Sequence, residues 1–216
     1  MEIITFFIDL LFHLDQHLAE LLAQYGPWLY AILFLIVFCE TGLVVTPFLP
    51  GDSLLFMAGA LAAGGGLDPA VLIGLLFVAA VLGDTVNYTI GKYFGRRIEH
   101  WNSRLINRRA LERTQAFYAR HGGKTIVIAR FVPIIRTFAP FVAGMSRMEY
   151  RRFVFFNVFG AALWVAPLTM LGYWFGNLPV VKNNLSAVVI GIVLLSVTPI
   201  VVAWWRERGG RAEGPA

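Results

Sequence analysis

Residues 38–53 read Phe38-Cys-Glu40-Thr-Gly-Leu-Val-Val-Thr-Pro47-Phe-Leu-Pro50-Gly-Asp52-Ser, an apolar stretch that prolines and glycines interrupt. A second stretch, 128–140, reads Ile128-Ala-Arg130-Phe-Val-Pro133-Ile-Ile-Arg136-Thr-Phe-Ala-Pro140. The first carries two carboxylates and the second two guanidiniums, and each such charge costs at least about 2.5–3.5 kcal/mol at the centre of a bilayer. Interrupted apolar segments at matching places in two halves of a chain are typical of a transporter binding site.

The composition is that of a membrane protein. The chain has 216 residues, is 58% hydrophobic and has a mean hydropathy of +0.69, whereas soluble domains are about 45–50% apolar. Four runs approach the ~20 apolar residues that cross a bilayer, at 28–45, 70–90, 153–175 and 185–205. We therefore expect one membrane domain at 1–205 and a cytoplasmic tail at 206–216. The start of the chain lacks the basic region and the small-residue cleavage site of a removable signal peptide.

The charge distribution predicts the orientation. All 18 Lys and Arg residues lie in 92–216, and none lies in 1–91. The basic loop near 96–124 is therefore expected on the cytoplasmic side, and the arginines at 206, 208 and 211 place the C-terminus on the same side. Nucleic-acid binding is the other explanation for clustered basic residues. The flanking apolar spans argue against it, so we expect no nucleic-acid partner.

The predicted fold class is an all-α polytopic membrane protein, an inverted repeat of a re-entrant helical hairpin plus a transmembrane helix. The N-terminal segment 1–24 mixes acids and histidines with apolar residues, which suits an amphipathic helix in the membrane interface. Asp68 and Pro69 are the expected N-cap and first residue of a transmembrane helix. The remaining elements are a first span or re-entrant hairpin at 28–64, transmembrane helices at 69–95, 153–177 and 185–205, a cytoplasmic basic loop or helix at 96–123, and a second re-entrant hairpin at 124–148.

Matching motifs in the two halves support the repeat. Ala58-Gly59 follows Pro50 much as Ala143-Gly144 follows Pro133, and Gly91-Lys-Tyr-Phe-Gly95 resembles Gly172-Tyr-Trp-Phe-Gly176. Two alternatives stay open. Residues 28–40 are long enough for a nearly complete span, and apolar segments can resemble each other by chance. The residues expected to form the hairpins are Pro47, Pro50, Gly51, Pro133, Pro140 and Gly144.

Hairpins that enter from opposite faces can meet at mid-depth, which would bring Glu40 and Asp52 near Arg130 and Arg136. These charges could be inert ion pairs that lock the hairpins together. However, buried ion pairs seldom add net stability, and the planar guanidinium fork suits phosphate. We therefore expect protons to neutralise Glu40 and Asp52 and free the two arginines to bind an anionic phosphate headgroup, so that proton and anion binding are linked.

Other polar residues have weaker claims. Asp84 shares a helical face with Asn87, and it is either bonded to neighbouring helices or a third proton site. Asn157, Gly160 and Trp164 share another face, for which close packing is the favoured interpretation. His13 and His17 have a metal-like spacing but no evident third ligand, and Ser53 has no obvious histidine partner. We therefore expect no metal, no cofactor and no enzymatic activity.

These motifs resemble the bacterial DedA family, also called SNARE-associated or VTT-domain proteins. The resemblance covers nearly the whole chain. Its most specific parts are 38–56, Gly83-Asp-Thr-Val-Asn-Tyr-Thr-Ile-Gly91 and 129–145. It implies an inner-membrane protein with two opposed re-entrant hairpins and roles in envelope maintenance, cationic-peptide resistance and cell division that depend on the proton motive force. It also implies functional residues at Glu40, Asp52, Arg130 and Arg136.

Some relatives are proposed to return undecaprenyl phosphate across the bilayer, and eukaryotic relatives scramble phospholipids. The resemblance thus favours a proton-coupled flippase of a lipid phosphate, with membrane lipids and protons as partners. A proton-coupled antiporter of small cations or drugs and a phospholipid scramblase are the alternatives. A membrane enzyme that acts on lipid phosphates is less favoured, because no nucleophile-base pair or metal cluster is evident. The sequence leaves open whether the protein forms a homo-oligomer.

Overall fold

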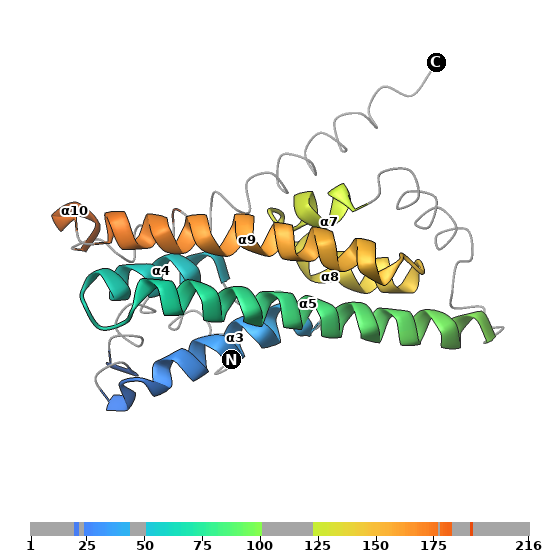
Figure 1. Cartoon of the computed structure of the whole chain (residues 1–216), viewed down its shortest axis with the longest axis horizontal. Helices are drawn as coiled ribbons and strands as arrows, with labels where there is room; N and C mark the ends of the chain where they lie inside the picture. Colours follow the sequence, from blue (N-terminus) through green and yellow to red (C-terminus); the bar gives the residue numbers. More distant parts are fainter. Residues whose placement is uncertain are drawn as a thin grey trace, which may run out of the picture.

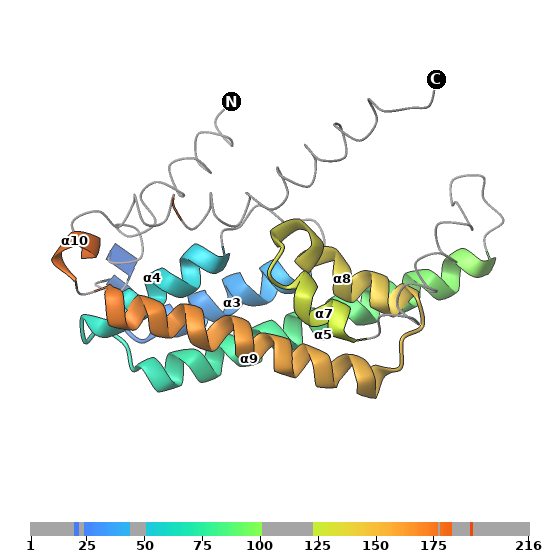
Figure 2. The same cartoon turned by 90° about the horizontal axis from the view of Figure 1, so that it is seen from above.

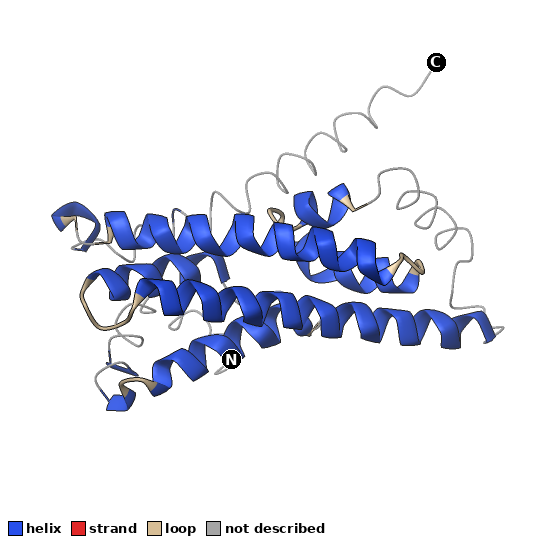
Figure 3. Ribbon diagram, in the orientation of Figure 1, coloured by secondary structure: helices blue, strands red, loops and turns tan. Residues whose placement is uncertain are grey.

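The computed structural model describes residues 20–21, 24–43, 51–100, 123–176, 178–182 and 191. Every regular element in these ranges is a helix (Figure 3). The helices are α3 (Trp28–Gly42), α4 (Gly51–Ala63), α5 (Pro69–His100), α7 (Lys124–Ala129), α8 (Pro133–Met145), α9 (Tyr150–Phe175) and α10 (Pro179–Lys182). The predicted interfacial helix 1–24 lies mostly outside the described residues. So do Pro47, Pro50, most of the basic segment 96–123 and all of the predicted span 185–205 except Gly191.

Two long helices form the axis of the molecule. The segments Pro69–Gly95 of α5 and Tyr150–Phe175 of α9 are long and apolar enough to cross a membrane, and they run side by side (Figure 1). The predicted start of α5 is confirmed, because Asp68 Oδ1 accepts hydrogen bonds from the backbone N–H groups of Ala70 and Val71 at 2.8 and 2.9 Å. These bonds satisfy two of the free N–H groups at the helix start.

Shorter helices flank this axis at its two ends. The helix α4 packs on α9 toward one end, whereas α8 packs on α5 and α7 on α9 toward the other (Figures 1 and 2). The helix α7 ends at Ala129, a short turn follows, and Val132 has an extended backbone directly before Pro133, which begins α8. A residue before proline is disfavoured from helical geometry, so the break follows from the sequence. Pro140, in contrast, lies inside α8 and does not interrupt it.

Glycines allow each short helix to touch a long one at backbone distance. A Cβ on Gly59 of α4 would meet the Thr169 carbonyl of α9, and one on Gly172 of α9 would meet the Phe56 carbonyl of α4. Small residues commonly permit such close approach between membrane helices. The short helix from the first half of the chain thus packs on the long helix from the second half.

The same arrangement occurs with the halves exchanged. A Cβ on Gly144 of α8 would meet the Tyr88 carbonyl of α5, and one on Gly91 of α5 would meet the Phe141 carbonyl of α8. Gly59 and Gly144 were matched in the sequence comparison of the two halves, as were Gly91 and Gly172. The inverted repeat itself stays a prediction.

Candidate functional site

Arg136, in the first turn of α8, joins three segments. Its Nη2 donates to Glu40 Oε1 near the end of α3, and its Nη1 donates to Asp52 Oδ1 at the start of α4 over 2.8 Å. Glu40 Oε1 also accepts the backbone N–H of Gly51 at 3.2 Å. Glu40 and Arg136 are buried, whereas the Asp52 side chain is 21% exposed. One guanidinium therefore holds two carboxylates, of which Asp52 is the more accessible.

Arg130, which directly follows α7, joins the two long helices. Its Nη2 donates to Asp84 Oδ2 of α5 and to Asn157 Oδ1 of α9, the latter over 2.6 Å. The Asn157 amide in turn donates to the Val81 carbonyl at 3.1 Å. The side chains of Arg130 and Asp84 are at most 3% exposed, and Asp84 lies near the middle of the long apolar segment. This second ion pair is therefore deep in the molecule.

Trp164 of α9 lies between the two arginines. The Arg136 Cζ is 4.7 Å from the centroid of its indole ring and the Arg130 Cζ is 5.8 Å from it, both within the range of a cation–π contact. The Trp164 Nε1–H donates to Asp52 Oδ1 at 2.7 Å. The indole thus connects the two ion-pair groups into one buried polar cluster, defined here as Glu40, Asp52, Asp84, Arg130, Arg136, Asn157 and Trp164.

The structure brings together the residues that the sequence singled out, but with different partners. Glu40 and Asp52 both meet Arg136, whereas Arg130 pairs with Asp84 instead. Of the expected hairpin residues, Gly51 begins α4 beside Glu40, Pro133 begins α8, and Gly144 lies against α5.

Sequence reasoning missed the polar roles of Asn157 and Trp164, which it assigned to packing. Their common face was predicted, since seven residues make about two turns of a helix. The signal that could have linked them to the site is that this face presents an amide and an indole N–H, which are both hydrogen-bonding groups. Asn87 also has a structural role, because its amide donates to the Thr41 and Thr137 carbonyls at 3.0 and 2.7 Å and so joins α3 to α8 through α5.

The buried polar cluster retains hydrogen-bonding capacity. Among the residues of the cluster, two buried donors have no partner, Arg130 Nη1 and Arg136 Nε, and neither do two buried acceptors, Glu40 Oε2 and Asp84 Oδ1. Buried polar atoms in folded proteins nearly always have a partner. The free donors lie on the two guanidiniums, the groups best suited to a phosphate oxygen.

The charges of the cluster do not balance. Three carboxylates and two guanidiniums carry a net charge of −1 when all five are ionised. Asp84 and Arg130 form a one-to-one pair, so the excess negative charge lies on the Arg136 side. Among the described residues, including those of the cluster, no three His, Cys, Asp or Glu side chains gather as a metal site would need.

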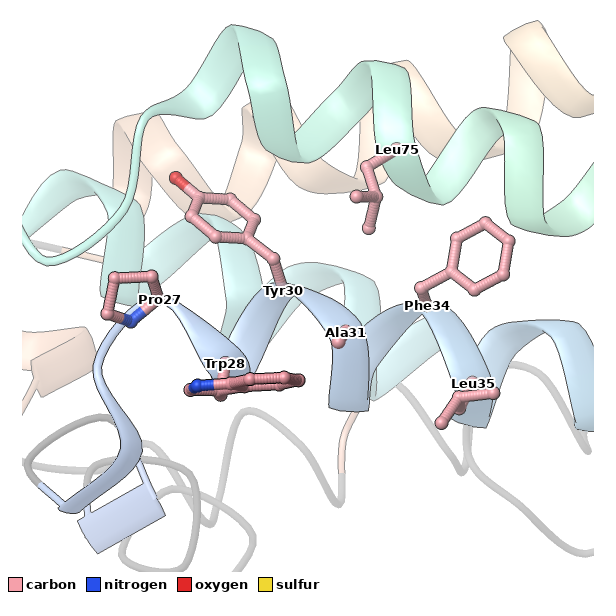
Figure 4. Close-up of a pocket in the computed structure, with 7 residues that line it drawn as sticks. All are labelled: Pro27, Trp28, Tyr30, Ala31, Phe34, Leu35 and Leu75. Carbon is pink, nitrogen blue, oxygen red and sulfur yellow. The ribbon is translucent and has the colours of Figure 1, made fainter.

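An apolar groove lies apart from the cluster, between the start of α3 and α5 (Figure 4). It is lined by Pro27, Trp28, Tyr30, Ala31, Phe34, Leu35 and Leu75. Tyr30 is anchored there, because its hydroxyl oxygen accepts the backbone N–H of Asp68 at 2.6 Å. None of these residues belongs to the buried polar cluster.

Comparison with known proteins identifies a VTT domain and relatives that are named DedA or membrane proteins. The VTT domain model matches residues 49–174. The chain is 54% identical over 215 residues to Protein DedA of Escherichia coli K12, covering 98% of each. It is 42% identical over 171 residues to an uncharacterized membrane protein of Mycobacterium leprae, covering 79% of this chain and 77% of that protein. It is 36% identical over 221 residues to Inner membrane protein YqjA of E. coli K12, and this match covers 98% of this chain and 100% of that protein. No solved structure matches.

Proposed function

The chain belongs to the DedA family of VTT-domain proteins and is an inner-membrane protein. From its buried polar cluster we propose that it is a flippase of a lipid phosphate, such as undecaprenyl phosphate. We propose that the proton motive force drives this movement. The observation that carries this proposal is Arg136, which is held by two carboxylates from the other half of the chain. A buried ion pair is a weak device for stability, and one inside a membrane is a functional-site hypothesis by default.

The topology that we propose places this cluster at mid-depth. The helices α3, α4 and α8 have 15, 13 and 13 residues, fewer than the ~20 needed to cross the hydrocarbon core. We propose that α3–α4 and α7–α8 are re-entrant hairpins that enter from opposite faces. The packing of α4 and α8 near opposite ends of the long helices supports this. We propose that the C-terminus is cytoplasmic, because the positive-inside rule assigns both the basic loop and the basic tail to the cytoplasmic side.

The proposed mechanism is a competition for the guanidiniums. Protons on Glu40 and Asp52 remove the negative charges that hold Arg136, and the freed donors bind the phosphate headgroup. Release of the protons on the other side restores the ion pairs and expels the phosphate. Proton and phosphate thus change each other's affinity through the same residues, which is thermodynamic linkage. Asp84 either remains the fixed partner of Arg130 or takes up a further proton.

The test is transport by the full-length protein in liposomes that contain fluorescent undecaprenyl phosphate. Accessibility of the lipid to a membrane-impermeant quencher, with and without a pH gradient, reports movement between leaflets. We expect gradient-dependent movement, lost in Arg136→Lys because lysine lacks the planar fork. Arg151→Lys, at an exposed position on α9, is the matched control. Movement that ignores the gradient, or that survives Arg136→Lys, contradicts the proposal. Chemically unchanged lipid at the end of the assay is expected of a transporter that is not an enzyme.

A second candidate follows from the net charge of the cluster. One excess carboxylate on the Arg136 side could hold a monovalent or organic cation in exchange for a proton. Addition of cations to proteoliposomes without lipid phosphate would then move protons, as a pH-sensitive dye in the lumen would report. Movement of ordinary phospholipids in both directions without any gradient would instead indicate a scramblase.

A further inference from the structure

We propose that Asp52 occupies the position that the phosphate takes, and that the indole N–H of Trp164 is a phosphate-binding donor alongside Arg136. This inference rests on the proposed function and assigns a binding residue to it. The evidence is a convergence of donors: Trp164 Nε1 and Arg136 Nη1 both point to Asp52 Oδ1, over 2.7 and 2.8 Å. An anionic oxygen that accepts two such donors is what a phosphate presents.

Asp52 is the carboxylate that can leave. Its side chain is 21% exposed, whereas those of Glu40 and Asp84 are 1% and 3% exposed. It also sits in the first turn of α4. An incoming anion therefore meets Asp52 first and can replace it without breaking the Arg130–Asp84 pair.

Trp164 is fixed in place by more than its bond to Asp52. The residue is 2% exposed and its ring faces both guanidiniums, so departure of Asp52 leaves the indole N–H oriented toward the same position. The indole nitrogen is a donor and never an acceptor. Once Asp52 is displaced, the N–H needs another acceptor, and a phosphate oxygen supplies one. Both guanidiniums also retain an unused donor, Arg130 Nη1 and Arg136 Nε.

Trp164→Phe separates this role from packing, because it keeps an aromatic ring and removes only the N–H and part of the ring. The assay is binding by the full-length protein in nanodiscs, with inorganic phosphate, a short-chain prenyl phosphate and the matching prenyl alcohol as probes. A hydrogen bond to a charged group corresponds to roughly a ten- to hundredfold change in affinity. We expect that loss for both phosphates and none for the alcohol. Tighter binding of the prenyl phosphate than of inorganic phosphate identifies a lipid headgroup as the ligand, and equal binding identifies free phosphate.

Trp174→Phe is the matched control, since Trp174 lies on the same helix but is 63% exposed. Asp52→Asn provides a second measurement that does not depend on the folding of Trp164→Phe. It removes the competing charge and should tighten phosphate binding at least severalfold. If wild-type protein binds phosphate and Trp164→Phe binds it equally well, or if Asp52→Asn does not tighten binding, the inference is wrong while the proposed function survives. If wild-type protein binds neither phosphate, both fail.

Discussion

The Arg130–Asp84 pair allows a quantitative test of how the cluster is held together. Asp84→Asn leaves the Arg130 guanidinium buried with the neutral oxygen of Asn157 as its remaining described hydrogen-bond acceptor. Both side chains of the pair are at most 3% exposed, and breaking such a pair from one side costs about 3–5 kcal/mol. Arg130→Met leaves Asp84 as the uncompensated charge and should cost at least as much. Each single variant is therefore expected to be strongly destabilised.

The double variant Asp84→Asn/Arg130→Met removes both charges. What remains is the Asn157 oxygen without its donor, which costs about 1–3 kcal/mol. The double variant should therefore be more stable than either single variant, with a coupling energy of about 3 kcal/mol or more. Unfolding of the purified protein in mixed micelles, followed by circular dichroism, measures all four free energies. Arg151→Met, at an exposed position, controls for the loss of a guanidinium. Additive effects of the two single changes would refute the reasoning.

Three further predictions concern the scaffold. Gly144→Ala should destabilise the protein, because the new Cβ would overlap the Tyr88 carbonyl. Gly74 has open space around it, so Gly74→Ala should instead gain about 0.5–1 kcal/mol of stability. Thermal unfolding of both variants checks the contrast. Arg147→Gly should stabilise the protein by about 1 kcal/mol in the same thermal unfolding measurement. The reason is that Arg147 has φ of 58° just after α8, a conformation in which glycine has no Cβ penalty. A loss of stability would show that the arginine side chain matters more than its backbone strain. Asp68→Ala should lower the free energy of unfolding by about 0.5–2 kcal/mol, because α5 loses its N-cap. Asp68→Asn should retain most of that stability, because asparagine also caps helices. Equal losses of stability in both variants would contradict the capping role.

Local features of the fold were predictable from the sequence, whereas the partners within the site were not. Asp68 and Pro133 act through the backbone of their own neighbours, so a cap and a helix break follow from the residues alone. The choice of Asp84 rather than Glu40 or Asp52 as the partner of Arg130 depends on how α7 lies against α5 and α9. No periodicity encodes that contact between distant segments. Trp164 resembled a packing residue because its ring does pack, and only its N–H reveals the polar role.

The exchanged glycine contacts have a consequence for biogenesis. Gly59 in α4 fits against Thr169 in α9, which the ribosome makes roughly a hundred residues later. At about 5–20 residues per second, the nascent α4 waits on the order of 5–20 s for that surface, and for most of that time Asp52 and Glu40 also lack Arg136. The two halves are thus interlocked rather than stacked in sequence. Assembly in the bilayer can be completed only after α9 has been inserted, so the protein should be most vulnerable to membrane quality control before that step.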